Sequence, residues 1–157
     1  MKKKYAPVAL IVYNRPDTLK KTLKSLEKNK SIENAEIYIF SDGPKKKEDN
    51  KKVKKVRYII NNVKKLNIRK KFFFKKNRGL RNNILGGINY VLKKRSKIIV
   101  IEDDLLLSSY FYLYMNNALD FIEKKKNIWH VSAWNYPITF DKSARNLTFL
   151  WSHMHCW

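Results

Sequence analysis

A chain of 157 residues with 44% hydrophobic content is long enough for one domain with its own buried core. Its 35 basic and 13 acidic residues give a formal net charge of +22, which the spread of lysines along the chain favours as solvated helix faces, with a phosphate-rich or membrane partner as the alternative. The single cysteine, Cys156, excludes an intrachain disulfide and a thiolate metal cluster, and no apolar run approaches the roughly 18 residues of a membrane-spanning helix.

The chain begins with a predicted strand, a polar turn and a helix. Residues 8–13 form a short apolar run typical of a buried strand. Pro16 suits a first helical turn, and either Asn14 or Asp17 can cap that turn. Leucines at helical spacing then continue the helix to Asn29, with lysines on the opposite face.

A second unit of the same kind follows. Residues 36–40 predict a strand that stops at the sequence Ser-Asp-Gly-Pro, which leaves Asp42 at the tip of the strand. Taken alone, this setting favours an ordinary turn aspartate. Apolar residues at helical spacing predict a basic helix over residues 46–62.

The third unit consists of a strand at residues 71–74, a turn at residues 77–80 and a helix that contains Gly86 and Gly87. The contiguous phenylalanines of the strand alternate between its two sides, so they form no stacking platform for nucleic-acid bases. The two glycines weaken the helix by roughly 1 kcal/mol each, which favours a position where the backbone packs closely.

An acidic cluster follows the fourth predicted strand. Residues 97–101 form a β-branched run, and Glu102, Asp103 and Asp104 come directly after it. Adjacent carboxylates raise each other's pKa unless a cation or hydrogen-bond donors lie between them. The cluster therefore indicates a hard-cation site at the carboxyl end of the sheet, with a solvated acidic turn as the alternative.

The last predicted elements are a helix over residues 108–125 and a fifth strand over residues 128–133, followed by irregular or antiparallel structure. Five strands that alternate with four helices predict a single α/β domain with a mainly parallel sheet and helices on both faces.

The order of these motifs resembles the GT-A glycosyltransferases, and most of all the N-acetylglucosaminyltransferase I-like group and its bacterial family 2 relatives. The motifs are Asn-Arg-Pro, Ser-Asp-Gly and Glu-Asp-Asp after strands, an Asn-x-Gly-Leu turn, and Ser-Ala-Trp-Asn at residues 132–135. The resemblance covers residues 8–157. It implies a Rossmann-like GT-A nucleotide-diphospho-sugar transferase fold and a metal-dependent glycosyltransferase.

The resemblance also implies roles for the acidic cluster. Asp104 matches the acid that ligates a divalent metal, manganese or magnesium, between the two phosphates of the donor. Glu102 and Asp103 would face the sugar and ribose side of that donor. The donor would be a nucleotide sugar, a UDP-sugar in particular.

Further donor contacts are implied outside this cluster. Asp42 matches the acid that hydrogen-bonds the nucleotide base, and Arg15 matches a basic residue near the nucleotide. Asn77, Arg78 and Arg81 match more loosely and are expected near the donor. Without the resemblance, the position of Arg15 favours a surface cation at the start of a helix.

The acceptor half and the catalytic base are expected beyond Trp157, so residues 1–157 are interpreted as a single donor-binding domain. The expected acceptor is a glycan or a glycolipid, and the expected location is cytoplasmic, with peripheral contact to an anionic membrane as a further hypothesis. Two alternatives remain open: an inactive truncated fragment of such an enzyme, and a basic phosphate- or nucleic-acid-binding protein. No nucleic-acid reading motif is visible, so no nucleic-acid partner is expected.

Overall fold

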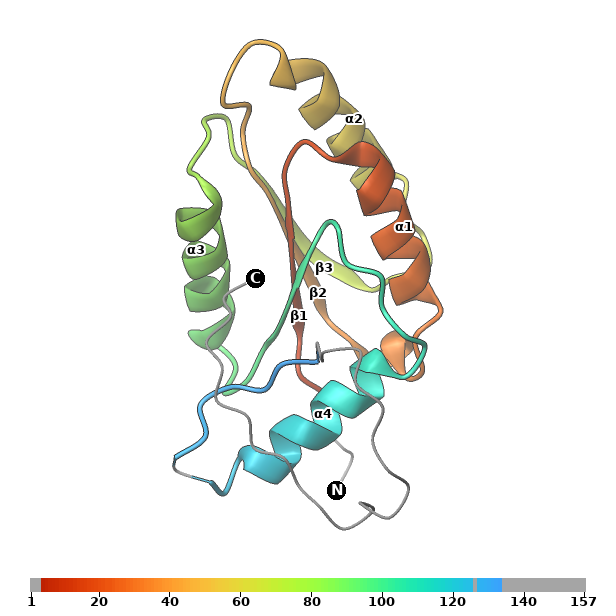
Figure 1. Cartoon of the computed structure of the whole chain (residues 1–157), viewed down its shortest axis with the longest axis vertical. Coiled ribbons are helices and arrows are strands. Elements are labelled where there is room, and N and C mark those ends of the chain that lie inside the picture. The colour runs from red at the N-terminus through yellow and green to blue at the C-terminus, as the bar shows by residue number, and fades with distance from the viewer. Residues whose placement is uncertain (1–3, 126, 134–157) are drawn as a thin grey trace, which may run out of the picture.

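The structure of the protein is a computed structural model that describes residues 4–125 and 127–133. These residues form a four-stranded sheet with helices on both faces, which confirms the predicted α/β class (Figure 1). In chain order the elements are β1 (Val8–Val12), α1 (Pro16–Glu27), η1 (Ile32–Asn34), β2 (Ile37–Ser41), α2 (Asp49–Asn61), β3 (Ile68–Phe73), α3 (Leu80–Leu92), β4 (Ile99–Glu102) and α4 (Phe111–Ile122).

The sheet is parallel throughout and has the strand order β3-β2-β1-β4. β1 pairs with β2 on one side, where Val12 is opposite Ser41, and with β4 on the other, where Ile11 is opposite Glu102. The order of the strands therefore changes direction between β1 and β4. In open parallel sheets, ligands bind at the carboxyl ends of the strands beside such a switch point.

Each face of the sheet has its own apolar core, because successive side chains of a strand point to opposite faces. Val8 and Leu10 pack with α1, α2 and α4, and Ala9 and Ile11 pack on the α3 side. Figure 1 shows α3 on one side of the sheet, and α1 and α2 on the other. All of these strand residues are at most 3% exposed, so the sheet is a rigid base for the loops at its ends.

Gly87 allows α3 to lie close to the sheet, as the sequence predicts for a glycine inside this helix, whereas Gly86 faces the side chain of Arg78. A Cβ atom at Gly87 would lie 3.1 Å from Cδ2 of Phe40 and 3.3 Å from Cδ1 of Ile11. The rings of Phe72 and Phe74 also pack on this α3 side, whereas Phe73 packs on the opposite face, which confirms the predicted alternation.

Two local predictions are wrong. Residues 128–133 lie in no strand, and Trp129 is 92% exposed. A segment with strand-like composition becomes a strand only where it pairs with the edge of a sheet. Residues 128–133 follow α4 and do not pair with the sheet. The predicted capping of α1 by Asn14 or Asp17 is also wrong: the N-cap residue is Arg15, and no side chain caps the helix. Asn14 instead donates its side-chain amide to Asp49.

Trp134 and Asn135 of the Ser-Ala-Trp-Asn segment lie outside the described residues, and so does all of the sequence after them. Within the described residues, no helix combines the length and the hydrophobicity that a membrane span requires.

Candidate functional site

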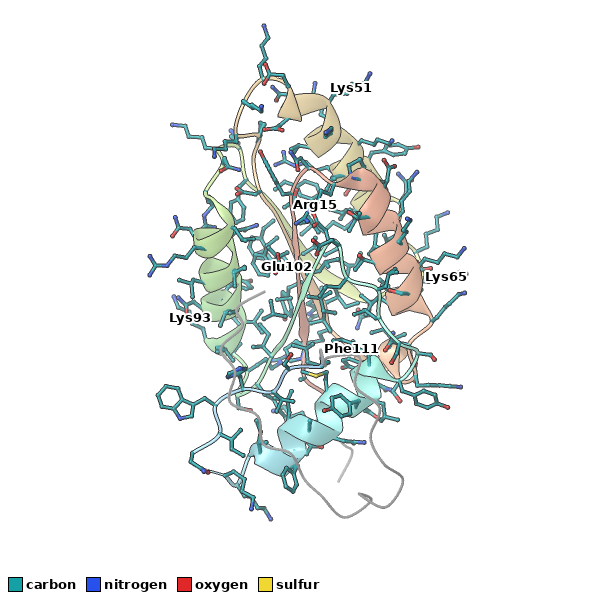
Figure 2. All side chains as sticks on the ribbon, in the orientation of Figure 1. Arg15, Lys51, Lys65, Lys93, Glu102 and Phe111 are labelled. Atoms are coloured by element: carbon teal, nitrogen blue, oxygen red, sulfur yellow. The ribbon has the colours of Figure 1, made fainter. Side chains whose placement is uncertain are left out.

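A pocket of about 270 Å³ lies at the carboxyl ends of β1, β2 and β4. Its walls come from these three strand ends, from the turn before α3 and from the first turns of α3. Figure 2 shows two of its residues, Arg15 and Glu102, between α3 and α1. The residues that line this switch-point pocket are Ile11, Val12, Tyr13, Arg15, Asp42, Lys45, Asn77, Gly79, Leu80, Asn83, Glu102 and Asp103.

Arg15 and Asp103 form the charged centre of the switch-point pocket. Asp103 is 1% exposed, and its Oδ2 accepts a hydrogen bond of 2.8 Å from the backbone N–H of Tyr13. Arg15 Nε lies 3.0 Å from Oδ1 of Asp103, and the same guanidinium also pairs with the exposed carboxylate of Asp104. One guanidinium thus pairs with two carboxylates: it donates a hydrogen bond to Asp104, whereas its contact with Oδ1 of Asp103 is an ion pair without a hydrogen bond.

Burial shifts the titration of two acids in the cluster. Burial raises the pKa of Glu102, and the negative charge of Asp104 raises it further. Burial also raises the pKa of Asp103, although the Tyr13 N–H and the Arg15 charge oppose that rise. The charged forms of both acids are therefore costly in the protein alone, and a bound cation would favour them.

Asp42 is 3% exposed and accepts three backbone hydrogen bonds. The N–H groups of Gly43 and Arg78 donate to its Oδ1 at 2.8 and 2.9 Å, and the N–H of Gly79 donates to its Oδ2 at 3.1 Å. The carboxylate therefore joins the end of β2 to the turn before α3. In this way it holds one wall of the switch-point pocket in place.

The three more loosely predicted residues separate in the structure. Asn77 lines the pocket, and its Nδ2 donates to the carbonyl oxygen of Gly43 at 2.9 Å. The Arg78 guanidinium instead lies over the Phe74 ring, 4.3 Å from its centroid. Arg81 is an exposed residue in the first turn of α3 and does not line the pocket.

Asn83 is a pocket residue that the sequence reasoning missed. It is 2% exposed, and its Nδ2 donates to the carbonyl oxygen of Phe40 at 3.2 Å. Its Oδ1 has no hydrogen-bond partner among the described residues. The available signal was spacing, because Asn83 lies four residues before Gly87 and so shares the helix face that packs on the sheet. A polar residue on such a face points to a ligand or a buried network.

A second missed residue, Asp49, supports the loop after β1. Its Oδ2 accepts from the Tyr13 hydroxyl at 2.7 Å, and its Oδ1 accepts from Nδ2 of Asn14 at 2.8 Å. These hydrogen bonds hold the pKa of Asp49 below its ordinary value, with the Tyr13 bond as the largest cause. The start of α2 thereby fixes the two residues that precede Arg15.

The acidic cluster does not by itself form a complete cation site. Among residues 4–125 and 127–133, no group of three His, Cys, Asp or Glu side chains converges in a metal-binding arrangement. Asp103 is turned inward to Tyr13, whereas Asp104 remains exposed at the rim beside Arg15. The exposed carboxylate oxygens of Asp104 are of the type that hard cations prefer.

A parallel sheet with a switch-point pocket, and with an acidic cluster at the end of β4, agrees with the GT-A fold that the sequence motifs resemble. The chain belongs to the GNT-I family, a family of glycosyltransferases, because the model of that family matches residues 1–137. This match confirms the resemblance seen in the sequence.

The comparison with solved structures finds TarS of S. aureus, with 21% identity and a TM-score of 0.46 over 75% of this chain and 20% of that one. A second structure, S. aureus TarS 1-349, has 20% identity and a TM-score of 0.48 over 75% of this chain and 32% of that one. The chain thus spans a third or less of the length of these proteins. No match was found among curated protein sequences.

Proposed function

We propose that this chain is the donor-binding domain of a metal-dependent glycosyltransferase that transfers a sugar from a nucleotide-diphosphate sugar to a glycan or glycolipid acceptor. One observation carries the proposal: Arg15, Asp42 and Asp103, which come from three different strand ends, meet in one pocket at the switch point of the sheet. Membership of the GNT-I family supports the same class of reaction.

In this proposal, Arg15 binds the diphosphate of the donor. Its guanidinium already contacts two carboxylates, and a diphosphate presents a similar pair of anionic oxygens. Lys45, which also lines the switch-point pocket, adds a second positive charge on the β2 side. These cations would neutralise charge that develops on the leaving group.

Asp104 is the proposed protein ligand of a divalent metal, manganese or magnesium. Its carboxylate is 41% exposed, so it is accessible to a cation that enters with the donor. When bound, the metal acts as a Lewis acid that offsets negative charge on the departing diphosphate. Glu102 and Asp103, placed deeper than Asp104, are proposed to face the ribose and sugar side.

Asn83 is the proposed contact for the nucleotide base. Its unpartnered Oδ1 can accept a hydrogen bond from a ring N–H, which uracil and guanine both offer and cytosine lacks, so it fits the proposed UDP-sugar and equally a GDP-sugar. Asp42, whose carboxylate already accepts three backbone N–H groups, would shape the wall beside the base. No described residue is assigned as the catalytic base of the transfer.

The test is calorimetric titration of the chain with UDP, GDP and CDP, each with and without Mn²⁺. We expect one nucleotide to bind in a metal-dependent way, and Asp104→Ala to weaken that binding at least about tenfold, the equivalent of one lost charge-assisted contact. Asp17→Ala is the matched control, because Asp17 is an acid with a 79% exposed side chain outside the pocket. Equal affinity with and without metal, unchanged in Asp104→Ala, would contradict the proposal.

A further inference from the structure

A basic and apolar surface lies where α1 meets the loop between β4 and α4. We name it the α1-loop surface, and it consists of Lys21 and Lys24 of α1, the C-cap residue Lys28, and Leu105, Leu106 and Tyr110 of the loop. A shallow pocket of about 410 Å³ runs between the two elements. The pocket residues are Lys21, Lys24, Ser25, Lys28, Leu106, Leu107 and Ser109.

The loop is held against α1 by specific contacts. The backbone N–H of Leu107 donates to Oγ of Ser25 at 3.2 Å, and the N–H of Lys30 donates to the carbonyl oxygen of Ser109 at 2.8 Å. Figure 1 shows this loop running beside α1 toward the start of α4. Leu107 packs on the apolar core, and its neighbour Leu106 remains 74% exposed. The α1-loop surface is therefore already formed in the protein alone.

The positive charge on the α1-loop surface is not compensated. Lys21, Lys24 and Lys28 are spaced three and four residues apart, so they lie along one exposed face of α1. Within the described part of the chain, none of the three makes an ion pair. Other lysines do, since Lys55 lies 3.5 Å from Asp17 and Lys97 pairs with Asp120.

The apolar part of the surface is as exposed as the basic part. Leu105 is 43% exposed and Tyr110 is 60% exposed, on either side of Leu106. A soluble polyanion would use the lysines but would leave these side chains in water. An anionic bilayer uses both, because its phosphates attract lysines while its acyl boundary takes up leucine and tyrosine side chains.

We propose that the α1-loop surface binds an anionic lipid bilayer, with the three lysines on lipid phosphates and Leu106 inserted at the acyl boundary. This inference goes beyond the proposed transfer reaction and does not require it. Because Leu106 is two residues from Asp104, the rim of the switch-point pocket would lie close to the lipid surface. An acceptor carried by a lipid would then reach the pocket without leaving the membrane.

The test is cosedimentation with vesicles that contain about 30% phosphatidylglycerol in phosphatidylcholine, and with pure phosphatidylcholine vesicles, at about 0.15 M salt. We expect binding to the anionic vesicles only. A Lys21→Gln, Lys24→Gln, Lys28→Gln variant should bind about 100-fold more weakly, since each lysine near the surface contributes a factor of about five. Leu106→Ser should also weaken vesicle binding, by about tenfold.

The matched control removes three lysines from α2, at Lys51, Lys52 and Lys54, and thereby lowers the net charge equally. Lys51 lies at the far end of the molecule from α4 in Figure 2, so this variant should keep most of its vesicle binding. Circular dichroism establishes that each variant is folded, and nucleotide titration of the same variants reports on the switch-point pocket separately.

Three results would overturn the proposal. The first is no binding of the unaltered chain to anionic vesicles. The second is an equal loss in both triple-lysine variants, which would indicate only a general charge effect. The third is binding of the same strength to single-stranded RNA and to vesicles, with no effect of Leu106→Ser, which would assign the surface to a soluble polyanion.

Discussion

Arg15 Nε lies 3.0 Å from Oδ1 of Asp103, and this contact joins the loop after β1 to the end of β4. The backbone N–H of Tyr13 donates to the other oxygen of the same carboxylate. Asp103 is almost fully buried, so these two contacts, rather than water, stabilise its negative charge. The acidic side of the switch-point pocket thus depends on the residues directly after the first strand.

Removal of the Arg15 charge should therefore destabilise the fold as well as the site. We expect Arg15→Met to lower the free energy of unfolding by about 1–2 kcal/mol in urea titrations, a modest loss because the Arg15 side chain is partly exposed. Adding Asp103→Asn should restore part of this stability, since a neutral amide can still accept from Tyr13 and needs no counterion. Simple additivity of the two single effects would show that the residues are not coupled.

Gly43 should tolerate no side chain. A Cβ atom there would lie 2.5 Å from the backbone carbon of Lys76 and 2.7 Å from its oxygen. Backbone atoms cannot move aside without displacing the turn that Asp42 holds. We expect Gly43→Ala to lower the free energy of unfolding by about 1–3 kcal/mol and to weaken nucleotide binding. An alanine variant with unchanged stability and unchanged binding would show that this turn can shift freely.

Gly86 and Gly87 should respond differently to alanine. A Cβ at Gly86 would meet only the guanidinium end of Arg78, at 2.7 Å, and that flexible side chain can rotate away. A Cβ at Gly87 would press on Phe40 and Ile11. We expect Gly86→Ala to gain up to about 1 kcal/mol from helix propensity, and Gly87→Ala to be the less stable of the two by at least about 1 kcal/mol in chemical denaturation. The reverse order would place the α3–sheet contact elsewhere.

Asp49 should contribute stability that depends on pH. Its pKa in the folded protein is lowered from 3.8, so the unfolded chain binds a proton more tightly than the folded protein does. Its contribution is therefore complete above pH 3.8 and is lost as the pH falls through the lowered value. We expect Asp49→Asn to lower Tm most at about pH 7, and the difference from the unaltered chain to shrink as the pH falls below about 4.

The control for this experiment is Asp17→Asn, which removes the same charge from a side chain that is 79% exposed and lies 3.5 Å from Lys55. That variant should change Tm little at any pH, because exposed ion pairs contribute little. A pH profile for Asp49→Asn that runs parallel to that of the unaltered chain would remove Asp49 from the supporting network.

Much of the fold follows from local sequence patterns. β1, β2 and β4 have the apolar composition of buried strands, whereas the edge strand β3 carries Arg69, Lys70 and Lys71 and is only partly buried. All four strands end near the predicted residue, so Asp42 and Glu102 fall at strand ends as expected. Parallel strands bring these ends to one edge of the sheet. This reasoning is sufficient to place the pocket there.

The contacts inside the pocket could not be predicted in the same way. Arg15 pairs with both Asp103 and Asp104. This pairing depends on the path of the loop between β1 and α1, and the hydrogen bonds of Tyr13 and Asn14 to Asp49 fix that path. The failed strand at residues 128–133 has a related cause, because composition shows that a segment can pair but not whether an edge is available.

The position of β1 between β2 and β4 has a consequence for the order in which the protein is made. β1 can pair with its first partner, β2, soon after it emerges from the ribosome. Its second partner, β4, is synthesised much later, because Tyr13 and Asp103 are 90 residues apart in the sequence. At typical rates of synthesis, that interval is about 5–20 s. During this time one edge of the most buried strand is open to other chains. The switch-point pocket is thus completed last, and nascent chains that end before β4 are expected to aggregate or to occupy chaperones.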